Sequence, residues 1–383
     1  MSVHDDDMVD ERPRSTIDAA GSESNDDSAV LSSDSSDDDD EPNRWPWVLP
    51  DYTATRVIFS CAHLRSLSLS SYRLAPPDTV SLPSLVTLLL SHVSDPGSDL
   101  ERLVAGCPRL ADLTLEACST GTALSIVGGA RLRRLALRCC HNLTAVAVDS
   151  SELQAFEYRG AVTDGSFLTM HGGGSMRVAD CKVDICEEEA TSEEELMNLR
   201  QLLQLFVNAE HLHLESARLG SGLDKGLPSF SSLLHLEMRG CLPDDDTGAI
   251  AAMSTVLEHA PNPETLSLAF HPQEHDFGDR PDYIRFSEEE LLGAHHLSYN
   301  PHSVLATPSA MIPCLRNQVR KINLVHYQGG TAQRALAKFL LSNAPVIDKL
   351  WCGFAEGPMW TQIQLMREIE GWLINKSAET HFA

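Results

Sequence analysis

The stretch Cys107-Pro-Arg-Leu110-Ala-Asp-Leu113-Thr-Leu115-Glu-Ala-Cys118 decides the fold. Its apolar residues follow the spacing L-x-x-L-x-L-x-x-C, which is typical of a leucine-rich repeat. Leu113 and Leu115 are two residues apart, so a β-strand would place both side chains on the same side. One such strand cannot bury that side alone, and the pattern therefore predicts a stack of similar units.

The same spacing recurs along the chain. The first five copies begin at Leu64, Leu85, Leu110, Leu132 and Leu153, and they lie 21, 25, 22 and 21 residues apart. These steps fall within the period of about 20–29 residues that the repeat requires. Residues 176–181 fit a degraded copy, and the later copies are Leu212–Leu214, Leu233–Met238, Leu266–Leu268 and Val319–Leu324.

Helical patterns separate some of the predicted strands. Ser98 with Glu101, and Ser192 with Glu195, each form the Ser-x-x-Glu pattern of a capping box, and apolar residues follow at helical spacing. Alternation of strand and helix predicts a mixed α/β fold. We expect a right-handed leucine-rich-repeat solenoid, with parallel strands on its concave face and helices and turns on its convex face.

Three regions are expected along the chain. Residues 1–44 are a disordered acidic tail, because residues 1–41 hold 15 acidic and 2 basic residues and almost no large apolar groups. Residues 45–300 form the solenoid. Residues 301–383 form a small C-terminal αβ cap, with a strand near 319–325, a helix from Thr331, a strand near 345–351 and a last helix at 360–373.

Composition excludes several classes of function. The formal net charge of −26 disfavours nucleic acid and anionic membranes as partners, since phosphate binding needs clustered lysine and arginine. The chain begins without a signal-peptide pattern and contains no long apolar run, and its ten cysteines fit buried positions in the repeats. These features predict a cytoplasmic or nuclear protein.

The repeat pattern also predicts which side chains face outward. Residues that flank the buried leucines alternate with them, and strands of neighbouring repeats lie about 4.8 Å apart. Arg138 and Arg159 are therefore expected side by side, with Glu116 and Glu157 close to them. A partner-binding surface with a basic centre is one interpretation, and a solvated face whose charges pair among themselves is the other. The candidate residues are Asp112, Glu116, Arg134, Arg138, Glu157, Arg159, His211, His213, His235 and Arg239.

The sequence contains no catalytic or cofactor motif that we recognise. His211, His213 and His235 could be read as a metal site, but no cysteine or carboxylate stands at a recognised ligand spacing, so exposed histidines are the better interpretation. The glycines at 172–174 lack the lysine of a phosphate-binding loop, and no G-x-S-x-G nucleophile motif occurs. We therefore predict a protein that is not an enzyme and that holds no cofactor or metal.

The chain resembles plant F-box/leucine-rich-repeat proteins that end in an FBD domain. The resemblance covers about residues 52–355. It is carried by the repeats, by the segment Phe206-Val-Asn-Ala-Glu-His-Leu212-His-Leu214, and above all by the segments Cys314–Leu324 and Leu336–Pro345 of the C-terminal region.

This resemblance implies a function. Such a protein recruits substrates to an SCF-type ubiquitin ligase: its F-box binds the Skp adaptor of the cullin complex, and its repeats hold the target protein. The F-box is expected before the repeats, where this chain has the acidic tail and only Arg44-Trp45 faintly matches. Two interpretations stay open, a ligase receptor whose F-box lies upstream, and a leucine-rich-repeat scaffold without a ligase role.

Overall fold

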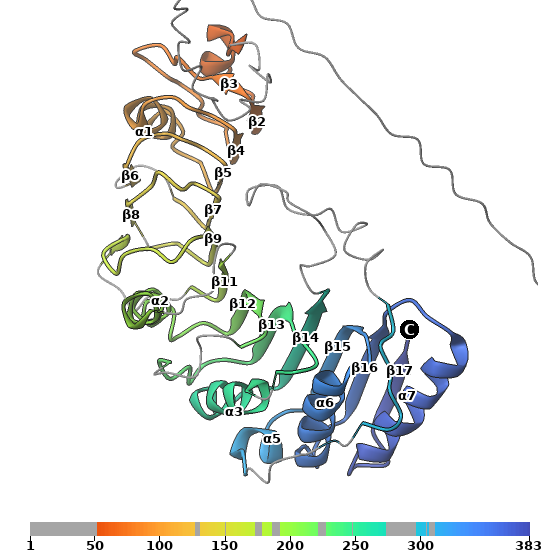
Figure 1. Cartoon of the computed structure of the whole chain (residues 1–383). Coiled ribbons are helices and arrows are strands. Elements are labelled where there is room, and N and C mark those ends of the chain that lie inside the picture. Colours follow the sequence, from red (N-terminus) through yellow and green to blue (C-terminus); the bar gives the residue numbers. More distant parts are fainter. Residues whose placement is uncertain are drawn as a thin grey trace, which may run out of the picture. The chain divides into compact units, whose positions relative to one another are not determined.

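The repeated strands form one long parallel sheet, as Figure 1 shows. This computed structural model describes residues 52–126, 131–149, 151–172, 178–185, 192–220, 227–246, 248–272, 296–303, 305 and 311–383. The predicted acidic tail, residues 1–44, lies outside the described residues. Within the described ranges the sheet has 12 strands in the order β17-β16-β15-β14-β13-β12-β11-β9-β7-β5-β4-β2.

Each predicted repeat in the first half contributes one strand of this sheet. Leucines at the alternating positions are buried, and Leu113 and Leu115 are fully inaccessible. The predicted degraded copy supplies β11, in which Cys181 and Val183 are buried. The strands of this half are β2 (Ser66–Ser70), β4 (Thr87–Ser91), β5 (Asp112–Glu116), β7 (Arg134–Arg138), β9 (Ala155–Gly160) and β11 (Asp180–Ile185).

The second half continues the same sheet without a change of direction. Thr265 on β14 pairs with Lys321 on β15, and the pairings from β14 through β15 and β16 to β17 are all parallel. The predicted boundary at residue 301 therefore corresponds to no break in the sheet, and Leu49–Ala383 form one compact unit. These strands are β12 (His211–Arg218), β13 (His235–Cys241), β14 (Thr265–His271), β15 (Lys321–Tyr327), β16 (Lys349–Phe354) and β17 (Glu379–Phe382).

Helices and a second small sheet cover the apolar side of the long sheet (Figure 1). The second sheet has the strand order β10-β8-β6, and Leu124, Val146 and Leu168 on it are buried. These three strands were not predicted from the sequence. They are β6 (Ala123–Ile126), β8 (Ala145–Asp149) and β10 (Leu168–His171), and a separate parallel pair joins β1 (Tyr52–Thr53) to β3 (Tyr72–Arg73).

One of the two predicted capping boxes is confirmed. Ser192 and Glu195 exchange both hydrogen bonds at the start of α2 (Glu193–Gln204). The other is wrong: α1 (Gly97–Ala105) follows Pro96 with no side-chain cap, and Glu101 instead accepts a hydrogen bond from the backbone N–H of Ser125 on β6. The remaining helical elements are η1 (Arg56–Ser60), α3 (Ala249–His259), α5 (Pro313–Asn317), α6 (Thr331–Asn343) and α7 (Met359–Trp372).

A common turn follows the first strands of the long sheet. The residue after β5, Ala117, has φ of 49°, and the residue after β7, Cys139, has φ of 51°. In this left-handed conformation, the Ala117 N–H donates to the Arg138 carbonyl and the Cys139 N–H donates to the Arg159 carbonyl. Each turn is thus hydrogen-bonded to the next repeat, which keeps the strand ends in register. The residue after the turn is the buried Cys118 in one repeat and the half-buried Cys140 in the next.

Candidate partner-binding face

Side chains on the face of the sheet turned away from the helices form three rows. We call the part of these rows on β5, β7, β9, β11, β12 and β13 the polar face. Strand register places Asp112 opposite Arg134, and Glu116 opposite Arg138. All ten candidate residues from the sequence analysis lie in these rows. The rows are Asp112-Arg134-Ala155-Asp180-His211-His235, Thr114-Ala136-Glu157-Lys182-His213-Glu237 and Glu116-Arg138-Arg159-Asp184-Glu215-Arg239.

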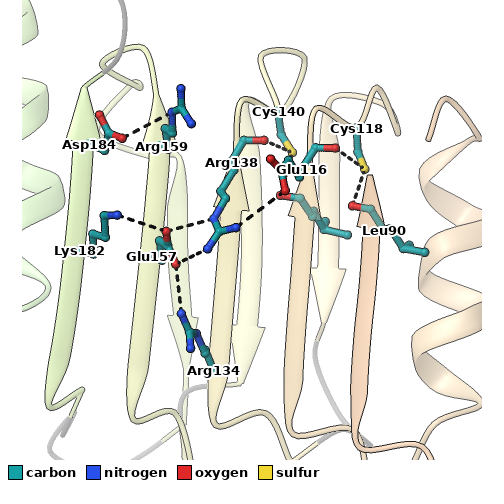
Figure 2. A network of polar contacts seen from close by, with 11 residues as sticks. Leu90, Glu116, Cys118, Arg134, Arg138, Cys140, Glu157, Arg159, Lys182 and Asp184 are labelled. Carbon is teal, nitrogen blue, oxygen red and sulfur yellow. Dashed lines mark hydrogen bonds and ion pairs between the residues drawn. The ribbon is translucent and has the colours of Figure 1, made fainter. Parts of the chain in front are cut away.

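Glu157 on β9 is the centre of an ion-pair network, shown in Figure 2. Its carboxylate accepts two hydrogen bonds of 3.0 Å from Arg138 and one of 3.3 Å from Arg134, and the Lys182 Nζ lies 3.7 Å away. The Glu157 side chain is only 10% exposed. Burial alone would raise its pKa, but hydrogen bonds from Arg138 and the charges of Arg138 and Lys182 hold the pKa of Glu157 below its ordinary value.

The two arginines that were expected to form a basic centre both lie against carboxylates (Figure 2). Arg138 and Arg159 are register partners, as predicted. Arg138 binds Glu157 and lies 3.8 Å from Glu116, whereas the Arg159 Nε lies 3.4 Å from the buried Asp184. Arg138 and Arg159 therefore follow the interpretation in which the charges of this face pair among themselves. The residue at the centre of the ion pairs is the carboxylate Glu157, not an arginine.

Histidines and carboxylates occupy β12 and β13. The rings of His211 and His235 meet edge to face with centroids 4.5 Å apart, and His211 Nδ1 lies against Asp180. His213 lies 3.6 Å from both Glu215 and Glu237. Burial lowers the pKa of His213 to about 4, so its imidazole is neutral at pH 7. Among the described residues, no group of three or more histidine, cysteine or acidic side chains could hold a metal ion.

Side chains of these rows line an open hollow of about 560 Å³ on the surface of β7, β9, β11, β12 and β13. Arg134 and Lys182 line it on one side, and His211, His235 and Glu237 on the other. The Arg134 side chain is 53% exposed and is thus within reach of a partner. Sequence reasoning missed Asp180, Lys182 and Asp184, which all come from the degraded repeat. The alternation Cys181-x-Val183-x-Ile185 is the signal that could have identified their strand.

The charge of Glu157 is expected to stabilise the fold in a pH-dependent way. Replacing Glu157 by glutamine should lower the free energy of unfolding by about 1–3 kcal/mol at pH 7, because charge-assisted hydrogen bonds are lost. Since the folded pKa lies below the ordinary value of 4.5, this contribution is complete above pH 4.5 and disappears as the pH falls through the folded pKa. Denaturant unfolding of both proteins between pH 7 and pH 3 measures the difference.

Glu152→Gln is the matched control for this measurement. Glu152 pairs with Arg131 at 3.7 Å, but their side chains are 40% and 79% exposed, so the change should alter stability by less than about 0.5 kcal/mol. A Glu157→Gln difference that is the same at pH 7 and pH 3 would contradict the assigned role of the charge.

A parallel sheet built from leucine-spaced repeats, covered on one side and polar on the other, defines a leucine-rich-repeat protein. The family model described as "FBD-associated F-box protein At5g56370, LRR repeats" matches residues 42–170. The F-box/LRR-repeat protein At5g35995 of Arabidopsis thaliana is 26% identical over 235 residues, which make up 57% of this chain and 50% of that protein. The chain thus matches about half the length of this relative.

These matches confirm the resemblance to plant F-box/leucine-rich-repeat proteins. No solved structure matches the chain. None of the helices in the described ranges is long and apolar enough to span a membrane.

Proposed function

We propose that this chain binds a protein target on the polar face, as the substrate-recruiting part of an SCF-type ubiquitin ligase receptor in the cytoplasm or nucleus. The observation that carries the proposal is the polar face itself, an array of alternating charges around a hollow on a regular sheet. Repeat proteins of this kind bind partners on such extended surfaces. Similarity to F-box/leucine-rich-repeat proteins supports the link to a ligase.

The charged side chains of the polar face are held in place by ion pairs, which suits this face to the recognition of a charged protein segment. Arg134, Arg138 and Lys182 surround Glu157, whereas Asp180, Glu215 and Glu237 lie towards β12 and β13. The face therefore carries two arginines on β7, Arg134 and Arg138, and carboxylates on each of the strands β9, β11, β12 and β13. A target segment with an acidic and a basic side chain in the matching order would be selected by charge complementarity.

Partner capture by surface variants tests this proposal. The tagged full chain is used to isolate proteins from plant extract, in parallel with the double variant Arg134→Ala/His235→Ala, which changes two exposed residues at the hollow. We expect at least one protein that the wild type captures and that the variant loses by tenfold or more. The matched control His63→Ala/Arg65→Ala changes two exposed residues before β2 and should retain that protein. Equal capture by all three proteins would refute binding at the polar face.

A second candidate function is an interaction protein without a ligase role, which uses the same face. The two are distinguished by the adaptor: co-purification of the Skp adaptor and cullin with the full chain supports the ligase receptor. Target capture without either subunit supports the second function. Partner capture by the variants therefore tests whether the polar face binds a target. Co-purification of the Skp adaptor tests separately whether the chain belongs to a ligase.

A further inference from the structure

Two cysteines from neighbouring repeats lie next to each other at one end of the polar face. Cys118 and Cys140 each stand two residues after a strand, and the strand ends before them, Glu116 and Arg138, are register partners. The Cys118 Sγ lies 3.4 Å from the Leu90 carbonyl oxygen, and the Cys140 Sγ lies 3.6 Å from the carbonyl oxygen of Leu115 (Figure 2). The two cysteines thus occupy equivalent positions of neighbouring repeats.

Cys118 differs in acidity from Cys107, Cys181 and Cys314, which are also buried. Burial raises the pKa of Cys107 to about 12 and that of Cys314 to about 11, and it also raises the pKa of Cys181. In contrast, the hydrogen bond from the Cys140 thiol lowers the pKa of Cys118 to about 7, although burial opposes this. The pKa of Cys140 is raised, because its proton is held by the Cys118 sulfur and because it is buried. The pair thus loses its first proton more readily than an isolated buried thiol does.

We propose that Cys118 and Cys140 form a dithiol that a peroxide oxidises to a disulfide, joining the repeats of β5 and β7. The geometry suits such a bond. Adjacent strands lie about 4.8 Å apart, and a disulfide joins residues whose Cα atoms are about 4.4–6.8 Å apart. Cys118 and Cys140 follow the register partners Glu116 and Arg138 at the same spacing, so no change in strand register is required.

The chemistry needs one equivalent of hydrogen peroxide. The Cys118 thiolate attacks one peroxide oxygen, the O–O bond breaks, and the released hydroxide takes up a proton to become water, leaving a sulfenic acid. The Cys140 sulfur then attacks the sulfenic sulfur, forming the S–S bond, and the departing hydroxyl leaves as water with the Cys140 proton. Two thiols are oxidised by two electrons, one peroxide is reduced, and two molecules of water are produced.

The disulfide would close the segment 118–140 into a loop directly beyond Glu116 and Arg138. Such a crosslink reduces the freedom of the unfolded chain, and we expect the unfolding midpoint to rise by about 2–5 °C. It would also fix the ends of β5 and β7 that carry the Arg138–Glu116 and Arg138–Glu157 contacts. The redox state of this pair would therefore act on one end of the polar face.

Peptide mapping tests the proposal. The reduced full chain is treated with hydrogen peroxide, and remaining thiols are then alkylated in denaturant before digestion. We expect the peptide with Cys118 linked to the peptide with Cys140, 2 Da lighter than the two separate thiol peptides. The bond should be reversed by dithiothreitol, while Cys107, Cys181 and Cys314 remain alkylated. No linkage, or irreversible oxidation of Cys118 alone, would overturn the proposal.

Variants identify the sulfur atoms, because Cys139 and Cys140 are adjacent. Cys139→Ser should keep the linked peptides, and Cys118→Ser and Cys140→Ser should each abolish them. A bond between Cys139 and Cys140 would contradict the assignment. Far-ultraviolet circular dichroism of each variant checks that it is folded. The rise in the unfolding midpoint on oxidation, present in wild type and Cys139→Ser and absent in Cys118→Ser, gives a second readout.

Discussion

Replacing Glu368 by alanine is expected to destabilise the protein by about 3–5 kcal/mol, because it leaves a buried arginine without its carboxylate partner. Arg334 on α6 is 3% exposed and donates three hydrogen bonds of 2.8–3.0 Å to Glu368 on α7. The same guanidinium donates to the Asn300 carbonyl and lies 4.8 Å from the ring centroid of Tyr299, whose hydroxyl donates to Glu368. This cluster joins α6, α7 and the segment 296–303.

Denaturant unfolding of the full chain measures the effect, with Glu370→Ala as the control. Glu370 is exposed on the same helix, so the control makes the same chemical change without uncovering a buried charge, and it should cost less than about 0.5 kcal/mol. Equal stabilities for the two variants would show that the Arg334–Glu368 pair contributes little to the fold.

Phe206→Ala is expected to cost about 3–5 kcal/mol, through lost burial and the cavity that remains. Phe206 is 1% exposed and follows α2. Its ring stacks on Phe156 of β9, with centroids 4.9 Å apart and an interplanar angle of 16°. This contact connects the chain after α2 to a strand that lies earlier in the sequence, so its loss weakens the middle of the repeat stack.

Met197→Ala on α2 is the control for that experiment. Its side chain is 56% exposed, and truncation should change the free energy of unfolding by less than about 0.5 kcal/mol. Thermal unfolding followed by circular dichroism would show both effects. A small change in Phe206→Ala would mean that the stack relaxes to fill the space, contrary to the packing described above.

The sheet could be predicted from the sequence because each strand repeats one simple rule. Leu113, Leu115 and their counterparts must alternate to be buried, and a fixed period leaves little choice of register. The second sheet was missed because Leu124 and Val146 belong to short apolar segments that periodicity alone does not assign to a strand. Likewise, the cap predicted at Ser98 was wrong because the helix already begins at Gly97, and because Glu101 accepts a hydrogen bond from Ser125 on β6 instead.

The candidate residues could also be placed on a common face, since alternation and register determine which side chains are neighbours. Which neighbour an ion pair selects could not be predicted. Arg159 lies against Asp184, a residue of the degraded repeat, and Arg138 divides its contacts between Glu157 and Glu116. These choices depend on side-chain rotamers and burial, which a spacing pattern does not contain.

Alternation along each strand separates the residues that are buried in the interior from the residues that face outward. Positions such as Leu113 and Leu135 hold the fold, whereas Asp112 and Arg134, their neighbours in sequence, point to the opposite side. The outward positions can therefore be diversified in the laboratory while the interior stays fixed. A library randomised at the exposed outward residues Arg134, His211 and His235, with the buried Glu157 and Asp184 kept, should yield folded chains with new binding preferences, which makes this scaffold a starting point for engineered recognition.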